Sequence, residues 1–282
     1  MSAGTTVKDL LQQAEQDLRA LDSARLDAEI LLCNVTGFDR SRLYAYPEEI
    51  VPEHKVNAYM TLVNERISGQ PVAYLTGTRE FWSIEFSVNQ HTLIPRPETE
   101  CLVEAALEHI PPDKSWRIAD LGTGCGTIAI AIAKERPDCQ IMAADISHDA
   151  LMVAVTNAGK LRINNVSFVK SDWYSGLAGP FELIISNPPY VREDDKHLSQ
   201  AEVRHEPMLA LSGGIDGLQA IRQIISRAPA YLTPGGRLFI EHGYDQGETV
   251  RSILAGHQFS EIGTRTDYAG HERVSYGRVF HG

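Results

Sequence analysis

The chain has 282 residues, of which 43% are hydrophobic and 22% charged, and its formal net charge at pH 7 is -11. This length allows one large domain or two modest ones, and the composition is that of an ordinary globular protein. The acidic balance, without a Lys- or Arg-rich run, argues against a protein that grips duplex nucleic acid and favours a protein or small-molecule substrate. The apolar stretches are too short to span a bilayer, and the N-terminal sequence does not resemble a signal peptide.

The cysteines indicate a reducing environment. All four are scattered along the chain without a CxxC pair, at Cys33, Cys101, Cys125 and Cys139. This spacing suits free thiols better than a disulfide or zinc framework, and the histidines show no HExxH or paired-ligand spacing. We therefore expect a cytoplasmic protein without a metal site. As a separate expectation, which the cysteines do not decide, the protein is taken to be a monomer.

Residues 1–76 are predicted to form a small helical domain. Apolar residues at spacings of three and four predict a first helix, then a second that is capped by Asp22 or Ser23 and ends near Gly37. A third helix carries Pro52 in its first turn. The apolar residues assigned to the core of this domain are Val7, Leu10, Leu11, Ala14, Leu18, Leu21, Leu26, Ile30, Leu31, Val35, Val56, Tyr59, Met60, Val63 and Ile67.

Residues 77–97 are predicted to form a β-hairpin connector. Two short strands, at 80–82 and 84–88, are separated by an abrupt turn. Pro95 and Pro97 then stiffen the backbone just before a helix that begins near Glu98. The connector is interpreted as a rigid link whose position allows it to border the active site.

Residues 98–282 alternate between predicted strands and helices, which implies an α/β fold with a mainly parallel sheet covered on both faces. The last two runs, Glu261–Thr266 and Val274–Phe280, have no convincing helix between them and are expected to form a hairpin at one sheet edge. Ligands of such sheets bind beyond the carboxyl ends of the strands. The other predicted strands are Arg117–Leu121, Gln140–Asp145, Val166–Lys170, Glu182–Ser186 and Arg237–Glu241.

Three consecutive strand ends carry residues suited to a nucleoside cofactor. The first strand runs through Asp120 into the G-x-G-x-G loop 122–126, where glycines let a ligand approach the backbone closely. The loop alone fits a structural turn or an NAD site equally well. The second strand ends at Asp145, a carboxylate placed to accept hydrogen bonds from ribose hydroxyls, and the third is followed by Asp172 and Trp173, which suit an adenine.

The fourth strand ends in Asn187-Pro188-Pro189-Tyr190. An amide or aromatic amine nitrogen is a poor nucleophile because its lone pair is delocalised, and its two N–H groups need acceptors. The Asn187 carbonyl oxygen and the Pro188 backbone carbonyl could accept one each and turn the lone pair toward a methyl donor, while Tyr190 packs on the planar group. The residues assigned to catalysis are Asn187, Pro188 and Tyr190. Those assigned to the substrate are Asn187, Pro188, Pro189 and Tyr190, and those assigned to the cofactor are Gly122, Thr123, Gly124, Cys125, Gly126, Asp145, Asp172, Trp173 and Asn187.

Asn-Pro-Pro-Tyr is shared with DNA adenine and RNA guanine methyltransferases, so other segments decide the family. They are Gly69-Gln70-Pro71, Tyr74-Leu75-Thr76-Gly77, Arg79-Glu80-Phe81-Trp82, Leu93-Ile94-Pro95-Arg96-Pro97-Glu98-Thr99-Glu100, Arg204-His205-Glu206-Pro207, Gly213-Gly214, Asp216-Gly217-Leu218, Asp267-Tyr268-Ala269-Gly270 and Glu272-Arg273-Val274. With these segments nearly the whole chain resembles the PrmC/HemK family, the protein-(glutamine-N5) methyltransferases of peptide chain release factors.

The resemblance implies a Rossmann-like, seven-stranded class I methyltransferase sheet with a helical N-terminal domain that helps to hold the release factor. It also implies S-adenosyl-L-methionine as methyl donor, S-adenosyl-L-homocysteine as product, and a modulating effect on translation termination. The implied substrate is the glutamine of the Gly-Gly-Gln motif in class 1 release factors. Cys125 departs from the family, in which Ser or Thr is more usual, and we hypothesise that its thiol is sensitive to oxidation.

Other functions remain open at this point. A sister group methylates glutamine in a ribosomal protein and shares the Asn-Pro-Pro-Tyr and Arg-His-Glu-Pro segments. A nucleic-acid methyltransferase would flip a base into the same pocket, but it predicts a basic strip that the sequence does not show. A nicotinamide oxidoreductase would leave Asn187 to Tyr190 unexplained, and a non-catalytic binding module would be expected to lack Asn187 or Asp145.

Overall fold

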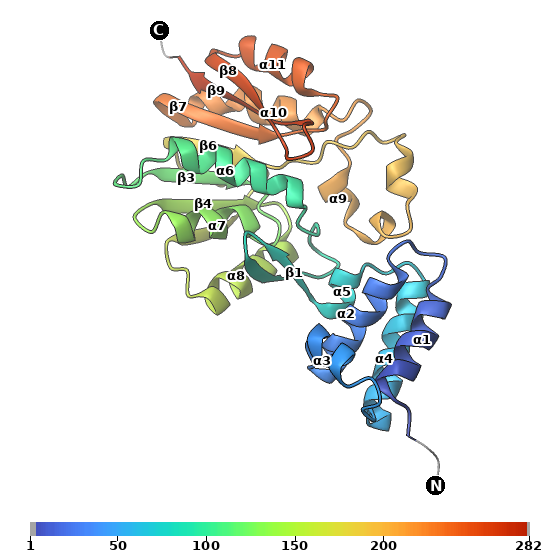
Figure 1. Ribbon diagram of the computed structural model, residues 1–282. Coiled ribbons are helices and arrows are strands. Elements are labelled where there is room, and N and C mark those ends of the chain that lie inside the picture. The colour runs from blue at the N-terminus through green and yellow to red at the C-terminus, as the bar shows by residue number, and fades with distance from the viewer. Residues whose placement is uncertain (1–3, 281–282) are drawn as a thin grey trace. The chain divides into compact units, whose positions relative to one another are not determined.

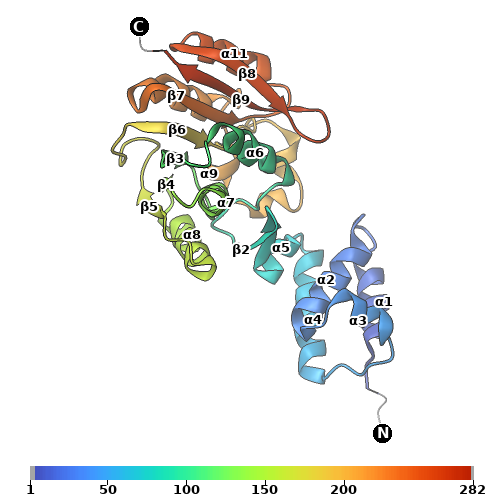
Figure 2. The ribbon, with the colours of Figure 1, turned by 60° about the vertical axis from the view of Figure 1, so that its left-hand side comes forward.

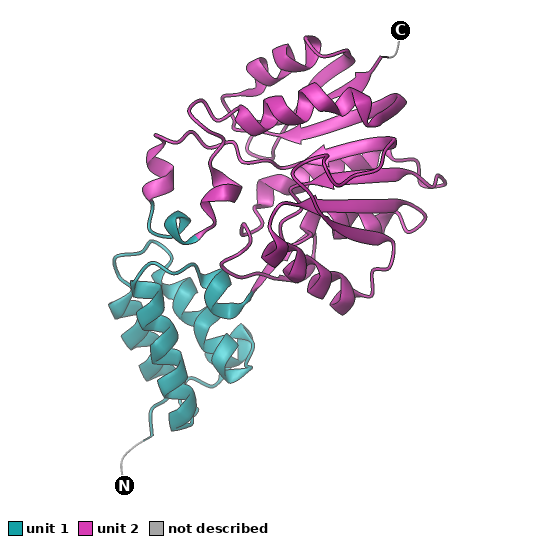
Figure 3. Ribbon diagram, turned by 180° about the vertical axis from the view of Figure 1, so that it is seen from behind, with its two compact units in different colours: residues 1–77, 200–205 teal, residues 78–199, 206–282 magenta. Residues whose placement is uncertain are grey.

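A computed structural model of the protein describes residues 4–280 (Figure 1). By its internal contacts the chain divides into two units (Figure 3). The helical unit runs up to Gly77 and also contains Gln200–His205, and the sheet unit contains the rest of the described chain from Thr78 onward. No helix within residues 4–280 is long and apolar enough to cross a membrane.

Local signals set the ends of the helices in the helical unit. The first helix begins with a capping box, in which Thr6 and Asp9 each accept a hydrogen bond from the other's backbone N–H. The second and fifth helices are followed by Gly37 and Gly77, both in the left-handed conformation that favours glycine. The helices of this unit are α1 (Val7–Asp17), α2 (Ala24–Thr36), α3 (Arg40–Ala45), α4 (Glu53–Ile67) and α5 (Val72–Thr76).

The three predicted helices are present, and the structure adds two short ones, α3 and α5. Pro52 precedes α4 as its N-cap and does not lie in its first turn. Two of the predicted core residues are on the surface, since Leu26 is 44% exposed and Ile67 is 53% exposed. The predicted core residues that are buried are Val7, Leu10, Leu11, Ala14, Leu18, Leu31, Tyr59 and Val63.

The second helix buries acidic residues that its apolar residues do not predict. Asp27 and Glu29 of α2 are almost completely buried, on different sides of the helix. Asp27 is paired with the equally buried Arg66, and Glu29 is paired with Arg25 and Arg40. The arginine partners balance the charge of these carboxylates. The carboxylates therefore occupy interior positions, where a pattern with polar residues outside and apolar residues inside would predict apolar side chains.

The connector is a two-stranded antiparallel sheet of β1 (Thr78–Phe81) and β2 (Ile84–Ser87). The turn residues Trp82 and Ser83 both have positive φ, at 55° and 53°, as in the primed turns that match the twist of a hairpin. A short 3-10 turn, η1 (Pro97–Thr99), precedes α6 (Glu100–His109). The predicted helix near Glu98 therefore starts as this turn, because Pro97 presets its backbone angle.

Seven strands within residues 4–280 form one sheet in the order β5-β4-β3-β6-β7-β9-β8. All neighbours pair in parallel except β9, which is antiparallel to both β7 and β8, so the predicted edge hairpin and the α/β fold are confirmed. Strands β3 to β5 have the predicted bounds. The strands are β3 (Arg117–Leu121), β4 (Gln140–Asp145), β5 (Val166–Lys170), β6 (Phe181–Ser186), β7 (Leu232–Glu241), β8 (Phe259–Thr266) and β9 (Glu272–Val279).

Strand β7 begins five residues earlier than the predicted Arg237, at Leu232. The added segment contains Pro234, Gly235 and Gly236, which a sequence pattern assigns to a turn. Leu232 pairs with Phe181 of β6, and the ladder resumes at Leu183 and Arg237 after a register shift. Such an irregularity accommodates residues that a regular ladder excludes.

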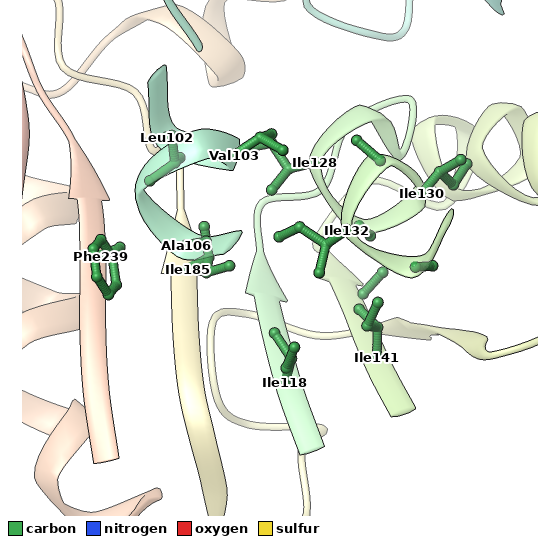
Figure 4. Packing of buried hydrophobic residues seen from close by; sticks show 14 of the residues in the cluster. Leu102, Val103, Ala106, Ile118, Ile128, Ile130, Ile132, Ile141, Ile185 and Phe239 are labelled. Carbon is green, nitrogen blue, oxygen red and sulfur yellow. The ribbon is translucent and has the colours of Figure 1, made fainter. Parts of the chain in front are cut away.

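Helices cover both faces of the sheet (Figures 1 and 2). Successive residues of one strand face opposite layers, so that Ile118 packs with α6 and α7 (Figure 4) whereas Ala119 packs with α10 and α11. Burial on both sides explains the nearly continuous apolar runs of the central strands. The remaining longer helices are α7 (Thr127–Glu135), α8 (His148–Leu161), α10 (Gln219–Arg227) and α11 (Gly247–Ala255).

Candidate active site

A cavity of about 390 Å³ lies at the carboxyl ends of β3 to β6 in the sheet unit. Its volume is within the range of about 300–1,000 Å³ that is typical of small-molecule sites. Residues 90–93 of the connector form part of its wall, as the position of that segment suggested, and parts of the chain between 207 and 223 form another. The predicted site residues that line it are Gly122, Gly124, Asp145, Asp172, Trp173, Asn187 and Pro189.

The glycine loop places backbone against the cavity. Gly122 has a φ of 76°, and a Cβ there would lie 3.6 Å from the Trp173 ring, in the space that a ligand would share. Gly126 has a φ of 88° and serves packing, because a Cβ there would meet Ile130 at 3.0 Å and Ala154 at 3.1 Å. The loop therefore combines one glycine at the cavity with another that lets α7 and α8 approach closely.

Other predicted loop residues lie outside the cavity wall. Thr123 is buried and its hydroxyl donates to Asp120 at 2.6 Å. Cys125 is also buried, and burial raises its pKa to about 12. Since the thiolate is the reactive form, this environment argues against the hypothesis that Cys125 is sensitive to oxidation.

Asp145 is held by two backbone N–H groups. Gly124 donates to Oδ2 at 2.8 Å and Ser147 donates to Oδ1 at 2.9 Å. Burial raises the pKa of this carboxyl, although both hydrogen bonds act in the opposite direction. Each oxygen of a carboxylate has a further lone pair, so the fixed side chain retains acceptor capacity for hydroxyl groups in the cavity.

The aromatic wall of the cavity is fixed by polar contacts. Trp173 has a φ of 49°, which is rare for a bulky residue. The Ser171 hydroxyl donates to its carbonyl at 2.8 Å, and its own indole N–H donates to Gln223 at 2.9 Å. Asp172 is exposed at the rim, and its backbone N–H donates to the Ser175 hydroxyl at 3.1 Å. The strained backbone and the two hydrogen bonds hold the indole ring against the cavity.

Asn187 is oriented by a residue far away in the chain. Its Nδ2 donates to the hydroxyl of Thr99 at 3.2 Å. With the nitrogen turned to Thr99, the carbonyl oxygen at the other end of the planar amide is directed away from Thr99. The side chain lines the cavity in this orientation.

The rest of the Asn187–Tyr190 motif is fixed by its surroundings. Pro189 lines the cavity, whereas Pro188 and Tyr190 are not part of its wall. The Tyr190 hydroxyl donates to Oε1 of Glu241 at 3.2 Å, and the Tyr190 carbonyl accepts from Gln246 at 3.1 Å. Burial raises the pKa of Tyr190, so its hydroxyl stays protonated and serves as a donor.

Two buried carboxyl groups flank the site. Burial raises the pKa of Asp120 and that of Glu241 to about 7 each. Among the described residues, Oδ1 of Asp120 and Oε2 of Glu241 complete no hydrogen bond. Sequence reasoning missed Thr99 and Glu241 as site residues, although Glu241 ends a predicted strand and could have been considered on that ground.

The PrmC N-terminal domain family matches residues 9–77, and the methyltransferase small domain family matches residues 99–208. The release factor glutamine methyltransferase of Salmonella typhimurium (strain LT2) is 48% identical over 269 residues, which cover 95% of this chain and 97% of that one. The release factor glutamine methyltransferase of Escherichia coli (strain K12) is 47% identical over 273 residues, covering 96% and 98%. This chain belongs to the release factor glutamine methyltransferase family.

Solved structures similar to this member of the release factor glutamine methyltransferase family share its fold at low identity. A methyltransferase from Pyrococcus furiosus has a TM-score of 0.53 at 15% identity and covers 70% of this chain and 89% of its own. A ribosomal protein L11 methylase from Lactobacillus delbrueckii subsp. bulgaricus has a TM-score of 0.50 at 20% identity, with 65% and 80% covered. The predicted family and the predicted methyltransferase fold are therefore both confirmed.

Proposed function

We propose that this release factor glutamine methyltransferase family member transfers the methyl group of S-adenosylmethionine to the side-chain amide nitrogen (N5) of the Gly-Gly-Gln glutamine in class 1 release factors. The observation that carries the proposal is that Asn187, with its amide nitrogen engaged by Thr99, lines the same cavity as the glycine loop and Asp145. An amide acceptor and a nucleoside-type site thus share one space.

The residues present fit the methyl donor. The Gly122 and Gly124 backbone leaves room for close approach, Asp145 keeps lone pairs for a ribose diol, and the Trp173 ring offers a surface for adenine. Asp172 at the rim offers a further polar contact. When bound, S-adenosylmethionine supplies an electrophilic methyl group on a sulfonium. Thr123, Cys125 and Gly126 support this proposed site from outside the cavity wall.

Asn187 and its neighbours bind and orient the target amide. The Asn187 carbonyl oxygen accepts one N–H of the glutamine amide, and the Pro188 carbonyl accepts the other. Two acceptors in fixed positions orient the nitrogen lone pair and stabilise positive charge that develops on nitrogen. Pro189 and Tyr190 hold the planar group in place. A strong base is not required, because the alkylated nitrogen loses its proton readily.

The helical unit is proposed to help bind the release factor. We also propose that the protein acts as a monomer and in the cytoplasm, where its four free cysteines stay reduced.

The test is transfer of labelled methyl from S-adenosylmethionine to a purified class 1 release factor, followed by mass mapping. We expect label on the Gly-Gly-Gln glutamine and none on a release factor in which that glutamine is replaced by alanine. Label on a ribosomal protein or on RNA, with none on the release factor, would preserve the methyltransferase assignment and overturn the proposed substrate.

A further inference from the structure

We propose that Thr99 and Glu241 are positioning residues for the transfer reaction, and that Glu241 acts through the Thr99 hydroxyl to keep the Asn187 carbonyl oxygen turned toward the target amide. This inference rests on the proposed role of Asn187 as an amide acceptor. It concerns which atoms donate and which accept in a chain of hydrogen bonds. This chain begins at Glu241, outside the cavity, and ends at Asn187, in the cavity wall.

The Asn187 side chain has two ends of opposite character, an acceptor oxygen and a nitrogen with two donors. Only the orientation with oxygen toward the substrate can receive an amide N–H. In the structure Nδ2 donates to Thr99 Oγ1 at 3.2 Å, which is the productive orientation. The Thr99 hydroxyl can itself donate one hydrogen. The acceptor of that hydrogen decides whether the nitrogen or the oxygen of the Asn187 amide faces Thr99.

Glu241 provides the destination. It is fully buried at the carboxyl end of β7, which pairs in parallel with β6, so its side chain lies beside the start of the Asn187–Tyr190 motif. The Tyr190 hydroxyl donates to Oε1, and Oε2 completes no hydrogen bond among the described residues, which leaves it as the acceptor open to the Thr99 hydroxyl. Contacts with both hydroxyls lower the pKa of Glu241, although burial outweighs them. An ionised carboxylate only accepts, so both hydroxyls direct their hydrogens to it. The Thr99 oxygen is then left to accept from Asn187 Nδ2.

The same carboxylate fixes both ends of the motif. Through Thr99 it sets the orientation of Asn187, and by accepting from the Tyr190 hydroxyl at 3.2 Å it holds the fourth residue. Neither Thr99 nor Glu241 is part of the cavity wall. Their effect is therefore on the position of the groups that touch substrate, and neither is a catalytic residue.

The ionisation state of Glu241 decides which groups donate and which accept along these hydrogen bonds. A protonated Glu241 can donate to a hydroxyl, which frees the Thr99 hydrogen to face Asn187 and disfavours the productive orientation. Burial places the pKa of Glu241 at about 7, so we expect the rate to rise with pH through this region. The charged groups that face Glu241 are Arg273 on β9, which lowers its pKa, and Glu98 on η1, which raises it. The other titratable groups near it are Tyr190 and Cys101.

The test compares Thr99→Val, which removes the hydroxyl at similar size, with Thr99→Ser, which keeps it. For labelled methyl transfer to a release factor we expect Thr99→Val to lower kcat by about 10–100-fold, as for other losses of alignment, and Thr99→Ser to stay within a few-fold of the wild type. Affinity for S-adenosylmethionine, measured by calorimetry, should stay near that of the wild type in both. Equal kcat values for the two variants would overturn the inference.

Glu241→Gln supplies an independent readout, because glutamine is similar in shape and does not ionise near pH 7. We expect its kcat to be reduced and the rise of rate through pH 7 to disappear. A profile that keeps this rise, or a wild-type profile that lacks it, would contradict the role of Glu241. If Glu241→Gln does not fold, the Thr99 pair decides alone.

Asn187→Ala separates this inference from the proposed function. If Asn187→Ala is inactive while Thr99→Val and Glu241→Gln are normal, only the positioning inference fails. If Asn187→Ala is itself nearly normal, the amide-acceptor role under the proposed function fails first.

Discussion

Carboxyl groups are buried in opposite ways in the helical unit and beside the active-site cavity of the sheet unit. In the helical unit Asp27 and Glu29 face arginine side chains, whereas in the sheet unit Asp120 and Glu241 face hydroxyl groups and each keeps one oxygen without a completed hydrogen bond among the described residues. A buried carboxylate with cationic partners serves the fold, because removal of a partner leaves an uncompensated charge. A buried carboxyl with incomplete partners beside a cavity costs stability, and such groups cluster at functional sites.

The helical unit shows how complete pairing affects a carboxyl. Glu29 accepts from Arg25 at 2.6 Å, from Arg40 at 2.6 Å and from the Tyr44 hydroxyl at 2.5 Å. Burial by itself would raise the pKa of Glu29, but the hydrogen bonds from Tyr44, Arg40 and Arg25 lower it below its ordinary value. In the sheet unit burial wins, and the pKa of Glu241 rises to about 7.

The largest expected effect is on the stability of the helical unit. Arg66 is 2% exposed and donates to Asp27 at 2.7 Å, and it also pairs with Glu202. Arg66→Met keeps much of the side-chain volume but leaves Asp27 buried without a cation, so we expect a loss of about 3–5 kcal/mol in the free energy of unfolding.

Spectroscopy can assign this loss to one unit. The three tryptophans, Trp82, Trp116 and Trp173, all lie in the sheet unit, so tryptophan fluorescence follows that unit and circular dichroism follows all helices. In urea we expect Arg66→Met to shift the circular dichroism transition more than the fluorescence transition. Arg25→Met, which removes a partly exposed partner of Glu29, is the matched control with a smaller loss. Equal stability of Arg66→Met and the wild type would remove the contrast between the units.

Asn187→Ala should give the complementary result in the sheet unit. Loss of the amide acceptor is expected to lower kcat by about 10²–10³-fold, equivalent to about 3–4 kcal/mol of transition-state stabilisation. The urea midpoint should change little, because the side chain faces the cavity. Steady-state methyl transfer to a release factor measures the first quantity, and near-normal turnover would refute the acceptor role.

Asp145→Ala should weaken the binding of S-adenosylmethionine. A lost hydrogen-bonded contact to a carboxylate costs about 1.5–3 kcal/mol, which corresponds to about 10–150-fold in Kd. Part of that loss reflects the Gly124 and Ser147 N–H groups that Asp145 now holds. Calorimetric titration measures it, with the surface variant Asp149→Ala as control, and an unchanged Kd would sink the ribose assignment.

The smallest effect is a difference in pH dependence. A carboxyl with a raised pKa stabilises the folded state below its unfolded pKa, and this stability is lost as pH rises through the folded pKa. Glu241 rises from an ordinary 4.5 to about 7, so between pH 5.5 and 7 we expect stability to fall by about 1–2 kcal/mol for this group. Glu241→Gln should reduce the slope of the fluorescence-detected urea midpoint over this range, and the slope that remains is due to Asp120, whose pKa is raised in the same way.

Glu29→Gln tests the other half of the comparison. Because the pKa of Glu29 is lowered, its contribution is present above its unfolded pKa and is lost as pH falls through its folded pKa. Glu29→Gln should therefore leave the slope between pH 5.5 and 7 unchanged. A flattened slope in Glu29→Gln, or an unchanged one in Glu241→Gln, would contradict the assignment of opposite pKa shifts to the two units.

Sequence patterns determined the sheet and one half of the site. The bounds of β3, β4 and β5, the glycine loop and Asp145 all follow from apolar runs that end in turn or acidic residues. In a parallel sheet successive strand ends meet at one edge, so residues that follow each strand by a fixed offset come together without knowledge of the full fold. This is why the residues proposed to bind the cofactor could be predicted to lie at one edge of the sheet.

Only the tertiary structure decided how the amide half is held. Thr99 on η1 and Asn187 after β6 lie 88 residues apart in the chain. Tyr190 and Glu241 lie 51 apart, and their contact depends on β7 being the neighbour of β6. The inward acids of α2 and the inclusion of Gln200–His205 in the helical unit depend in the same way on partners distant in the chain. Local periodicity encodes which residues a helix or strand presents, but the partner of a buried polar group is set by strand order and helix packing, which arise only when the whole chain folds.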